Sequence, residues 1–396
     1  MNRVKKRRIN PVRRAFAACL GNERTQFIAI PLFSILLSLL AASIVFLALG
    51  KNPLIAFQSL LQGSGILPKL SYAAKKSQLT DFVSMLNALT PMVFAALAVA
   101  VAFKTGLFNI GVSGQMLVAG FIASITVGYS DLPMAAALPL AIVVGIVCGA
   151  LYGALIGWLK HRFNINEVVT SIMLNYIVQY VISYFIYTNY INAVTRQSEQ
   201  ISAAARITLA DLEIFGLKMD IPLGFLLTIP VAFLVRYLMD KTRVGYELKV
   251  VGLNRRAARY AGIRVGRNIV LAMTISGALA GLAGVTYYMG YQATIQPKVL
   301  TSMGFDSIAV SLLGNSNPIG ILFSSLLITT ISEGGNYMRS MVNVPQEMSQ
   351  VITGLILLFS ACGAYIRYRV GITKDELVSL GAKSGSGADG EGGAEA

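Results

Sequence analysis

Long apolar stretches without any Asp, Glu, Lys or Arg alternate along this chain with short charged segments. Each apolar stretch has near or above the roughly 20 residues that a helix needs to cross the hydrocarbon core of a membrane. The stretches are 27–50, 82–103, 105–130, 132–159, 168–195, 268–297, 307–332 and 348–366. A shorter one, 221–235, reaches that length if Arg236 extends its charge toward the lipid headgroups. The pattern predicts an all-α, polytopic membrane protein.

The segment 304–333 is interrupted near its centre by the sequence GNSNPIG at 314–320. Glycine and proline at this spacing break a helix, so we expect two short or half-membrane helices here instead of one span. With them the chain has about ten transmembrane helices, two of them shortened. Two interpretations of the break stay open. It is either irregular backbone that lines a translocation path, where water or protein satisfies its polar groups, or a plain cytoplasmic turn.

Basic residues set the orientation, because loops on the cytoplasmic side retain Lys and Arg. Threading the helices from a cytoplasmic N-terminus places 24 of the 33 Lys and Arg residues inside and nine outside. Both termini are then cytoplasmic. The chain divides into a basic arm at 1–26, a transmembrane domain at 27–366 with a basic cytoplasmic loop at 240–267, and a cytoplasmic tail at 367–396. The end of the tail has almost no large apolar residue, so it is expected to be disordered.

Composition agrees with this architecture and argues against several classes of function. Only 13% of the residues are charged, where a soluble protein carries about a quarter, and the net charge of +15 follows from membrane orientation and not from nucleic-acid binding. The one histidine, His161, lies in a basic turn, and Cys19, Cys148 and Cys362 have no metal-like spacing. No phosphate-binding loop of the form GxxxxGK followed by Ser or Thr occurs. We therefore expect no metal, no cofactor and no enzymatic site, and any ATP must be used by a partner.

Three short motifs lie at the starts of apolar stretches or in the basic loop. They are FNIGVSGQ at 108–115, NEVVTSIMLN at 166–175 and VGLNRRAARYAGI at 251–263. Together they resemble the permease subunits of bacterial ABC importers in the branched-chain amino acid, ribose and simple-sugar group, over roughly 87–366. The forms FNIGxxGQ and NEVVxxIMLNY resemble most closely the permeases that work with lipoprotein receptors for nucleosides.

The resemblance implies a permease of the bacterial inner membrane that moves a neutral polar solute, nucleosides in the first place, into the cell. It also implies three partners within or beside the lipid bilayer: an ATP-binding subunit at the cytoplasmic face, a second permease subunit in a homo- or heterodimer, and an extracytoplasmic solute-binding lipoprotein. A pentose or other simple sugar is the alternative cargo, although 313–320 differs from the LGG and glycine-rich turn of the sugar-type relatives. An ion-coupled secondary transporter is the less favoured alternative: it ordinarily needs charged residues in mid-membrane, and the apolar stretches have none, so its ion site would consist of carbonyls and hydroxyls alone.

The loop 240–267 contains the residues that we expect to couple the chain to the ATP-binding subunit. Small alanines allow close approach of a groove on the partner, arginines pair with its acidic rim, and Gly262 ends a short helix. These residues are Asn254, Arg255, Arg256, Ala257, Ala258, Arg259 and Gly262. The plain alternative is a basic loop that follows the positive-inside rule, which explains the charge but not the AARYAG pattern.

Uncharged amides are the candidates for the substrate pathway, because they bind sugar hydroxyls or base edges without adding charge to the membrane. They are Asn109 and Gln115 from the first motif, and Asn175 and Gln179, which share a helix face four residues apart. Hydrogen bonding between helices is the alternative role for each of them. Asn166 and Glu167 fit the capped start of a helix better than a gate.

Overall fold

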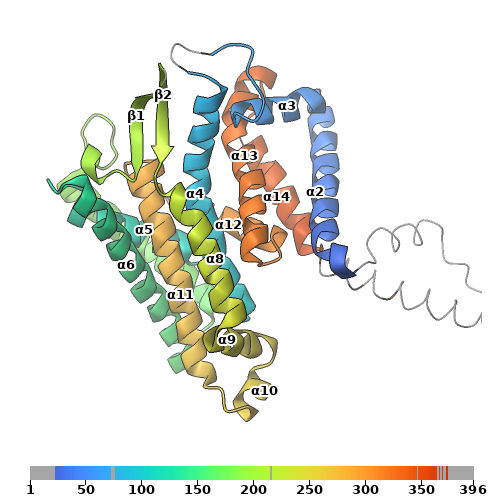
Figure 1. Cartoon of the computed structure of the whole chain (residues 1–396), viewed down its shortest axis with the longest axis vertical. Coiled ribbons are helices and arrows are strands. Elements are labelled where there is room, and N and C mark those ends of the chain that lie inside the picture. The colour runs from blue at the N-terminus through green and yellow to red at the C-terminus, as the bar shows by residue number, and fades with distance from the viewer. Residues whose placement is uncertain are drawn as a thin grey trace, which may run out of the picture.

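Figure 1 shows the computed structural model of the chain, which describes residues 23–72, 76–214, 216–345, 347–363, 365, 368 and 372. The predicted basic arm lies outside these residues apart from 23–26, and the predicted tail lies outside them apart from 368 and 372. The description that follows is therefore that of the predicted transmembrane domain.

The described chain is mainly helical. In order, the α-helices are α2 (Glu23–Ala48), α3 (Pro53–Gly63), α4 (Gln78–Lys104), α5 (Val112–Ala123), α6 (Met134–Phe163), α7 (Glu167–Phe185), α8 (Phe225–Lys241), α9 (Arg243–Leu253), α10 (Arg255–Tyr260), α11 (Val265–Thr286), α12 (Met303–Leu313), α13 (Pro318–Val342) and α14 (Met348–Ala361). The π-helical turns η1 (Ser124–Gly128), η2 (Ile186–Tyr190) and η4 (Tyr287–Tyr291) extend α5, α7 and α11, and η3 (Ala203–Ala205) is a 3₁₀ turn. Strands β1 (Thr208–Ile214) and β2 (Leu217–Pro222) complete the set.

Six of these helices are long and apolar enough to cross a membrane. They cover Ala29–Ala48, Gln78–Lys104, Met134–Phe163, Glu167–Tyr190, Val265–Tyr291 and Pro318–Val342. The shorter apolar helices are Val112–Gly128, Met303–Leu313 and Met348–Ala361, and α8 has 17 residues. The polytopic helical architecture is confirmed, whereas the number of crossings, about ten, and the cytoplasmic position of the termini stay predictions.

Helix α4 lies at the centre of the fold. Every side chain from Ala88 to Ala102 on it is buried, and α4 contacts α8, α11, α12 and α13. On one side of it α5, α6, α7 and α11 pack together, and on the other side α2, α3, α12, α13 and α14 do so, as Figure 1 shows. An apolar helix that is buried all round in this way belongs to the interior of a helical bundle.

The outer helices turn apolar side chains outward. On α2, the large residues Leu36, Leu40 and Ile44 follow one another at intervals of four and are more than half exposed. Such a continuous apolar stripe on a monomer would be an aggregation hazard in water, but it is the expected surface toward lipid chains. The outward faces of α6 and α7 carry similar residues.

Glycines pack α6 closely against α11. Gly145, Gly149 and Gly153 follow one another along one face of α6, opposite Gly277 and Gly281 of α11. A Cβ atom added at Gly149 would lie 2.2 Å from the carbonyl oxygen of Gly277, and one added at Gly281 would lie 2.1 Å from that of Gly145. The two backbones therefore touch without intervening side chains, which is how helices gain attraction in a membrane, where lipid and side chains are equally apolar.

The predicted interruption near 314–320 is present, but only one of the two helices beside it is short. Helix α12 has 11 residues, whereas α13 has 25. The chain turns through Asn315 and Ser316, both with left-handed backbone (φ 53° and 50°), and the Asn317 side chain accepts a hydrogen bond from the N–H of Ile319. Pro318 is the first residue of α13, where its missing N–H costs nothing, so it starts a full helix instead of shortening one.

The all-α expectation needs one correction, because β1 and β2 pair antiparallel from Thr208↔Pro222 to Ile214↔Leu217. The hairpin lies at one end of the molecule, and Thr208 Oγ1 donates to Asn87 Oδ1 of α4 (2.9 Å). Helices α9 and α10 lie at the opposite end (Figure 1). We call these the hairpin end and the basic end; the positive-inside rule assigns the basic end to the cytoplasm.

The glycine contact between α6 and α11 predicts a large effect of a single methyl group. We expect Gly277→Ala to destabilise the fold by about 1–3 kcal/mol, because the new Cβ forces the two backbones apart. The melting temperature of the purified protein in detergent measures this. Gly354→Ala on α14 is the matched control, since a Cβ there meets nothing within 4 Å. Equal melting temperatures for the two variants would contradict the close-packing account.

Candidate functional site

The predicted short helix in the basic loop is present as α10. The Asn254 side chain caps α10, since its Oδ1 accepts from the backbone N–H groups of Arg256 (2.9 Å) and Ala257 (3.1 Å). At the other end Gly262 has φ +76°, a left-handed conformation that glycine adopts without strain. Its N–H donates to the carbonyl of Arg259 (3.1 Å). The predicted helix end at Gly262 is confirmed, and the cap that Asn254 provides adds a role beyond the predicted one.

Most of α10 is exposed at the basic end. Arg256, Arg259 and Ala257 are exposed, so two arginines and a small residue face the surroundings together. Ala258 is wholly buried in the protein's own core, which corrects the expectation that it faces a partner. One side of so short a helix must pack against the domain, and the helical repeat places Ala258 on that side.

Two exposed residues beside this helix were missed in the sequence. Leu253, at the end of α9, is 86% exposed, and Tyr260, at the end of α10, is 94% exposed. A large aliphatic and an aromatic side chain that stand free in a basic loop are typical of protein contact sites, where Tyr and Arg are enriched. Their apolar character amid charge was the signal that could have identified them.

The basic end is tied to the transmembrane helices by several polar contacts. Arg255 donates to the carbonyl of Gly106 in the turn between α4 and α5 (3.3 Å). Glu247 of α9 accepts from Arg243 Nε (2.9 Å) and from Asn268 Nδ2 at the start of α11 (3.0 Å). The hydrogen bond from Asn268, then the one from Arg243, holds the pKa of the Glu247 carboxyl below its usual value. At the basic end, α10 is therefore tied to the turn between α4 and α5, and α9 is tied to the start of α11.

Asn109 and Gln115 lie together in a buried hydrogen-bond cluster. They are 1% and 0% exposed. Asn109 Nδ2 donates to Gln115 Oε1 (3.1 Å) and to Ser276 Oγ of α11 (2.8 Å), while Asn109 Oδ1 accepts from the N–H of Gly111 (2.9 Å). Ser276 in turn donates to the carbonyl of Ala98 on α4 (2.6 Å). In this conformation the pair joins α4, α5 and α11, and a role in the substrate pathway stays a prediction.

Asn175 and Gln179 share the inward face of α7, and each is bound to backbone instead of to the cluster around Asn109. Asn175 is buried, and its Nδ2 donates to the carbonyl of Ile110 (3.1 Å). Gln179 is half-buried, and its Nε2 donates to the carbonyl of Lys298, near the hairpin end. The two amides anchor α7 to two separate loops, and their part in the pathway also stays a prediction.

The predicted helix start at Asn166 is confirmed. Its Oδ1 accepts from the N–H of Val168 (2.9 Å), which caps α7. Glu167 forms an ion pair with Lys160 of α6. A carboxylate in the first turn also suits the positive end of the helix dipole. These contacts fix the connection between α6 and α7.

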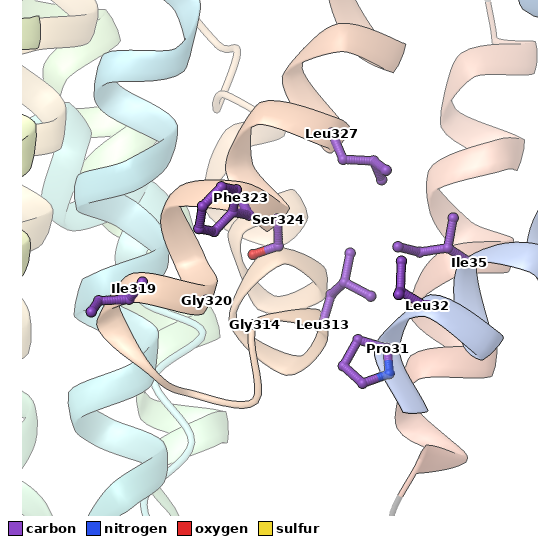
Figure 2. A pocket seen from close by; sticks show the side chains of 10 residues that line it. All are labelled: Pro31, Leu32, Ile35, Leu313, Gly314, Ile319, Gly320, Phe323, Ser324 and Leu327. Atoms are coloured by element: carbon purple, nitrogen blue, oxygen red, sulfur yellow. The ribbon is translucent and has the colours of Figure 1, made fainter. Parts of the chain in front are cut away.

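An apolar cavity of about 510 Å³ lies between α2, α12 and α13, as Figure 2 shows. Its lining includes Leu32, Ile35 and Phe323. The one polar side chain there, Ser324, donates to the carbonyl of Val310 (2.8 Å). The cavity therefore suits hydrocarbon and not a polar solute. Within the described ranges, no three His, Cys, Asp or Glu side chains gather as they must to hold a metal ion.

The buried cluster around Asn109 gives a test of its structural role. We expect Asn109→Leu to lose about 1–3 kcal/mol of stability, because the N–H of Gly111 and the Gln115 amide lose a buried partner. Melting of the purified protein in detergent measures this, with Asn336→Leu, at an exposed position of α13, as the control. A melting temperature that Asn109→Leu leaves unchanged would show that the cluster does not join the helices.

Known proteins are similar to this chain over almost the whole described domain. Residues 82–361 match the family described as the permease component of the branched-chain amino acid transport system. The chain is 33% identical over 354 residues to the guanosine ABC transporter permease NupP of Bacillus subtilis, covering 89% of this chain and 98% of that one. It is 32% identical over 348 residues to the nucleoside ABC transporter permease NupB of Lactococcus lactis, covering 86% and 92%.

A more distant relative has a different named cargo. The glucose ABC transporter permease TsgB13 of Haloferax volcanii is 28% identical over 353 residues, covering 87% of this chain and 90% of its own. The family match, the extent of the first two similarities and the helices long enough to cross a membrane agree with one another. The chain is a multi-pass membrane protein and belongs to the family of permease components of branched-chain amino acid type transport systems.

Proposed function

We propose that this chain is the transmembrane subunit of an ABC importer that moves nucleosides inward across the bacterial inner membrane. The observation that carries the proposal is the near full-length similarity to NupP and NupB, whose names give guanosine and nucleosides as cargo. A simple sugar is the second candidate, and the similarity to the glucose permease TsgB13, at lower identity, supports it. ATP is hydrolysed by partner subunits, in keeping with a sequence that has no phosphate-binding loop.

The ATP-binding subunit docks on the coupling surface, which we define as Leu253, Arg256, Ala257, Arg259 and Tyr260. This surface combines positive charge with two exposed apolar side chains. On the opposite side of α10, the buried Ala258 packs against the domain and holds the helix in place. Arginine and tyrosine are the residues that most often carry binding energy at protein interfaces. The solute-binding lipoprotein approaches the hairpin end, and a second permease chain, identical or related, completes the pathway.

Helix α11 is the physical link between these two ends. It starts at Val265, five residues after α10 ends, and with η4 it runs to Tyr291 at the hairpin end. Glycine packing holds it against α6 along much of this length. Packed elements of this kind move as units when an interface opens or closes. We therefore expect α6 and α11 to transmit movement of the coupling surface as one rigid body.

Charge reversal tests the coupling surface. We expect the double substitution Arg256→Glu and Arg259→Glu to weaken association with the ATP-binding subunit by about tenfold or more, since two favourable charge pairs become repulsive. Co-purification of the two subunits in detergent measures this. Arg196→Glu in a hairpin-end loop is the control, and Arg255 is left intact because it binds Gly106. An ATP-binding subunit that stays bound and active would show that the surface lies elsewhere.

Uptake into proteoliposomes tests the cargo. The vesicles hold this chain with the ATP-binding, permease and receptor proteins of its own source, and labelled nucleosides and pentoses are supplied separately. We expect nucleoside uptake that needs both ATP and the receptor. Pentose uptake in place of nucleoside uptake would contradict the proposed cargo and leave the ABC mechanism in place. Uptake by this chain alone, driven by an ion gradient, would contradict the importer itself.

A further inference from the structure

A second cavity, at the hairpin end, is polar. Its volume is about 100 Å³. The polar side chains that line it include Gln197, Tyr287, Gln292, Thr294, Gln296 and Thr301. A water needs roughly 10–15 Å³ by this measure, so the cavity holds several waters. It is smaller than the roughly 300–1,000 Å³ of pockets that enclose a whole ligand, so it takes one part of a solute, such as a base ring or a ribose.

The backbone around the cavity departs from regular helix. The turns η1, η2 and η4 all follow helices that reach the hairpin end, and η4 contributes Tyr287 to the lining. Single π-helical turns are rare and frequently occur at functional sites. In the segment after η4, Ala293 and Lys298 have left-handed backbone, with φ of 55° and 59°. Such strain in a non-glycine residue persists only where its surroundings hold it, and it gathers at ligand sites.

Packing holds this strained segment in place. Ala293 is wholly buried. The carbonyl of Lys298 accepts from Gln179 Nε2, and the N–H of Lys298 donates to Ser183 Oγ (2.7 Å). The N–H of Ile295 donates to Ser198 Oγ (2.8 Å). Gln179, which the sequence predicted to serve the pathway, therefore supports one wall of the cavity from α7.

The polar groups of the cavity suit a neutral solute with adjacent donors and acceptors. Thr294 Oγ1 donates to Gln197 Oε1 (2.8 Å), and this bond does not use the Nε2 hydrogens of Gln197, which a solute can accept from. Among the described residues the Gln296 side chain has no hydrogen-bond partner, and it is exposed. Glutamine offers a donor and an acceptor side by side, the arrangement that pairs with the edge of a nucleobase. The Tyr287 ring adds a surface on which a base can stack.

Charged groups close to the cavity are engaged elsewhere. The ammonium of Lys298 lies over the ring of Tyr187, 5.7 Å from its centroid. The carboxylate of Glu333 accepts from the hydroxyl of Tyr291 (2.7 Å). The lining itself has amides, hydroxyls and tyrosine rings but no charged side chain. An anionic or cationic solute would find no opposite charge there, whereas an uncharged one avoids that desolvation cost.

We propose that this cavity is a nucleoside subsite at the outer entrance of the pathway, where the amides of Gln197 and Gln296 bind the polar edge of the base or the ribose. The inference rests on the proposed function and adds a location and contacts to it. The rest of the solute lies outside the cavity, toward the receptor that delivers it.

Removal of the Gln296 amide tests the subsite by transport. In the proteoliposome system, with receptor saturated by labelled guanosine, we expect Gln296→Leu to lower guanosine carried per ATP hydrolysed by about tenfold, the effect of one lost hydrogen bond of the stronger kind. The variant breaks no hydrogen bond of the Gln296 side chain to another described residue. Gln200→Leu, an exposed glutamine in the loop before η3 that does not line the cavity, is the control. Unchanged guanosine transport by Gln296→Leu would overturn the proposal.

Chemical protection tests the subsite without transport. In a variant whose three cysteines are replaced by Ala, Val299→Cys, at an exposed lining position that keeps both amides, is labelled with a membrane-impermeant thiol reagent, and Gln200→Cys serves as the control. We expect guanosine to slow labelling of Val299→Cys and not that of Gln200→Cys. Absence of protection by guanosine and by ribose would overturn the subsite, whatever the uptake assay shows. Protection by ribose alone, with pentose uptake by the unmodified chain, would contradict the proposed cargo instead.

Discussion

The backbone contact between α6 and α11 is the interaction on which the other functional features depend. In a membrane, lipid tails are as apolar as leucine, so helices associate through close packing and hydrogen bonds and not through exclusion of water. Opposed glycines bring the two backbones together where any side chain would separate them. Because α11 lies between the coupling surface and the polar cavity, the same contact fixes the relative positions of both.

Polar groups inside the domain strengthen this arrangement. The Asn109 side chain reaches Ser276 on α11, which reaches the backbone of α4, so the helix that is packed by glycines on one side is held by hydrogen bonds on another. At the basic end Asn268 joins α11 to Glu247 of α9. The solute-facing amides that we propose lie instead at the hairpin end, where π-helical turns and left-handed residues interrupt regular backbone.

Features that depend on local pattern could be predicted from the sequence. The apolar stretches predicted the helices, and the end of α10 was predicted correctly because a terminal Gly262 acts on its own neighbours. The Asn254 cap is a local signal of the same kind that was not used. Tertiary contacts could not be read in this way. Asn109 bonds to a serine 167 positions away, and the burial of Ala258 depends on the surface beneath α10. The hairpin and the cavity at Gln296 are formed by loop segments, and no periodicity of apolar residues along the sequence indicates that these segments lie together.

The central claim is that α6 and α11 move as one body that joins the coupling surface to the polar cavity. Electron spin resonance distance measurements test it most directly, with labels at Arg264→Cys, an exposed position directly before α11 and outside the coupling surface, and at Gln292→Cys, in the variant without native cysteines. The 27 residues of α11 and η4 span about 40 Å at 1.5 Å a residue, which suits the method. The account predicts that this distance is equal in nucleotide-free and ATP-trapped complexes, while the distance between the Arg264 positions of two permease chains changes. A change of several ångström within one chain would contradict it.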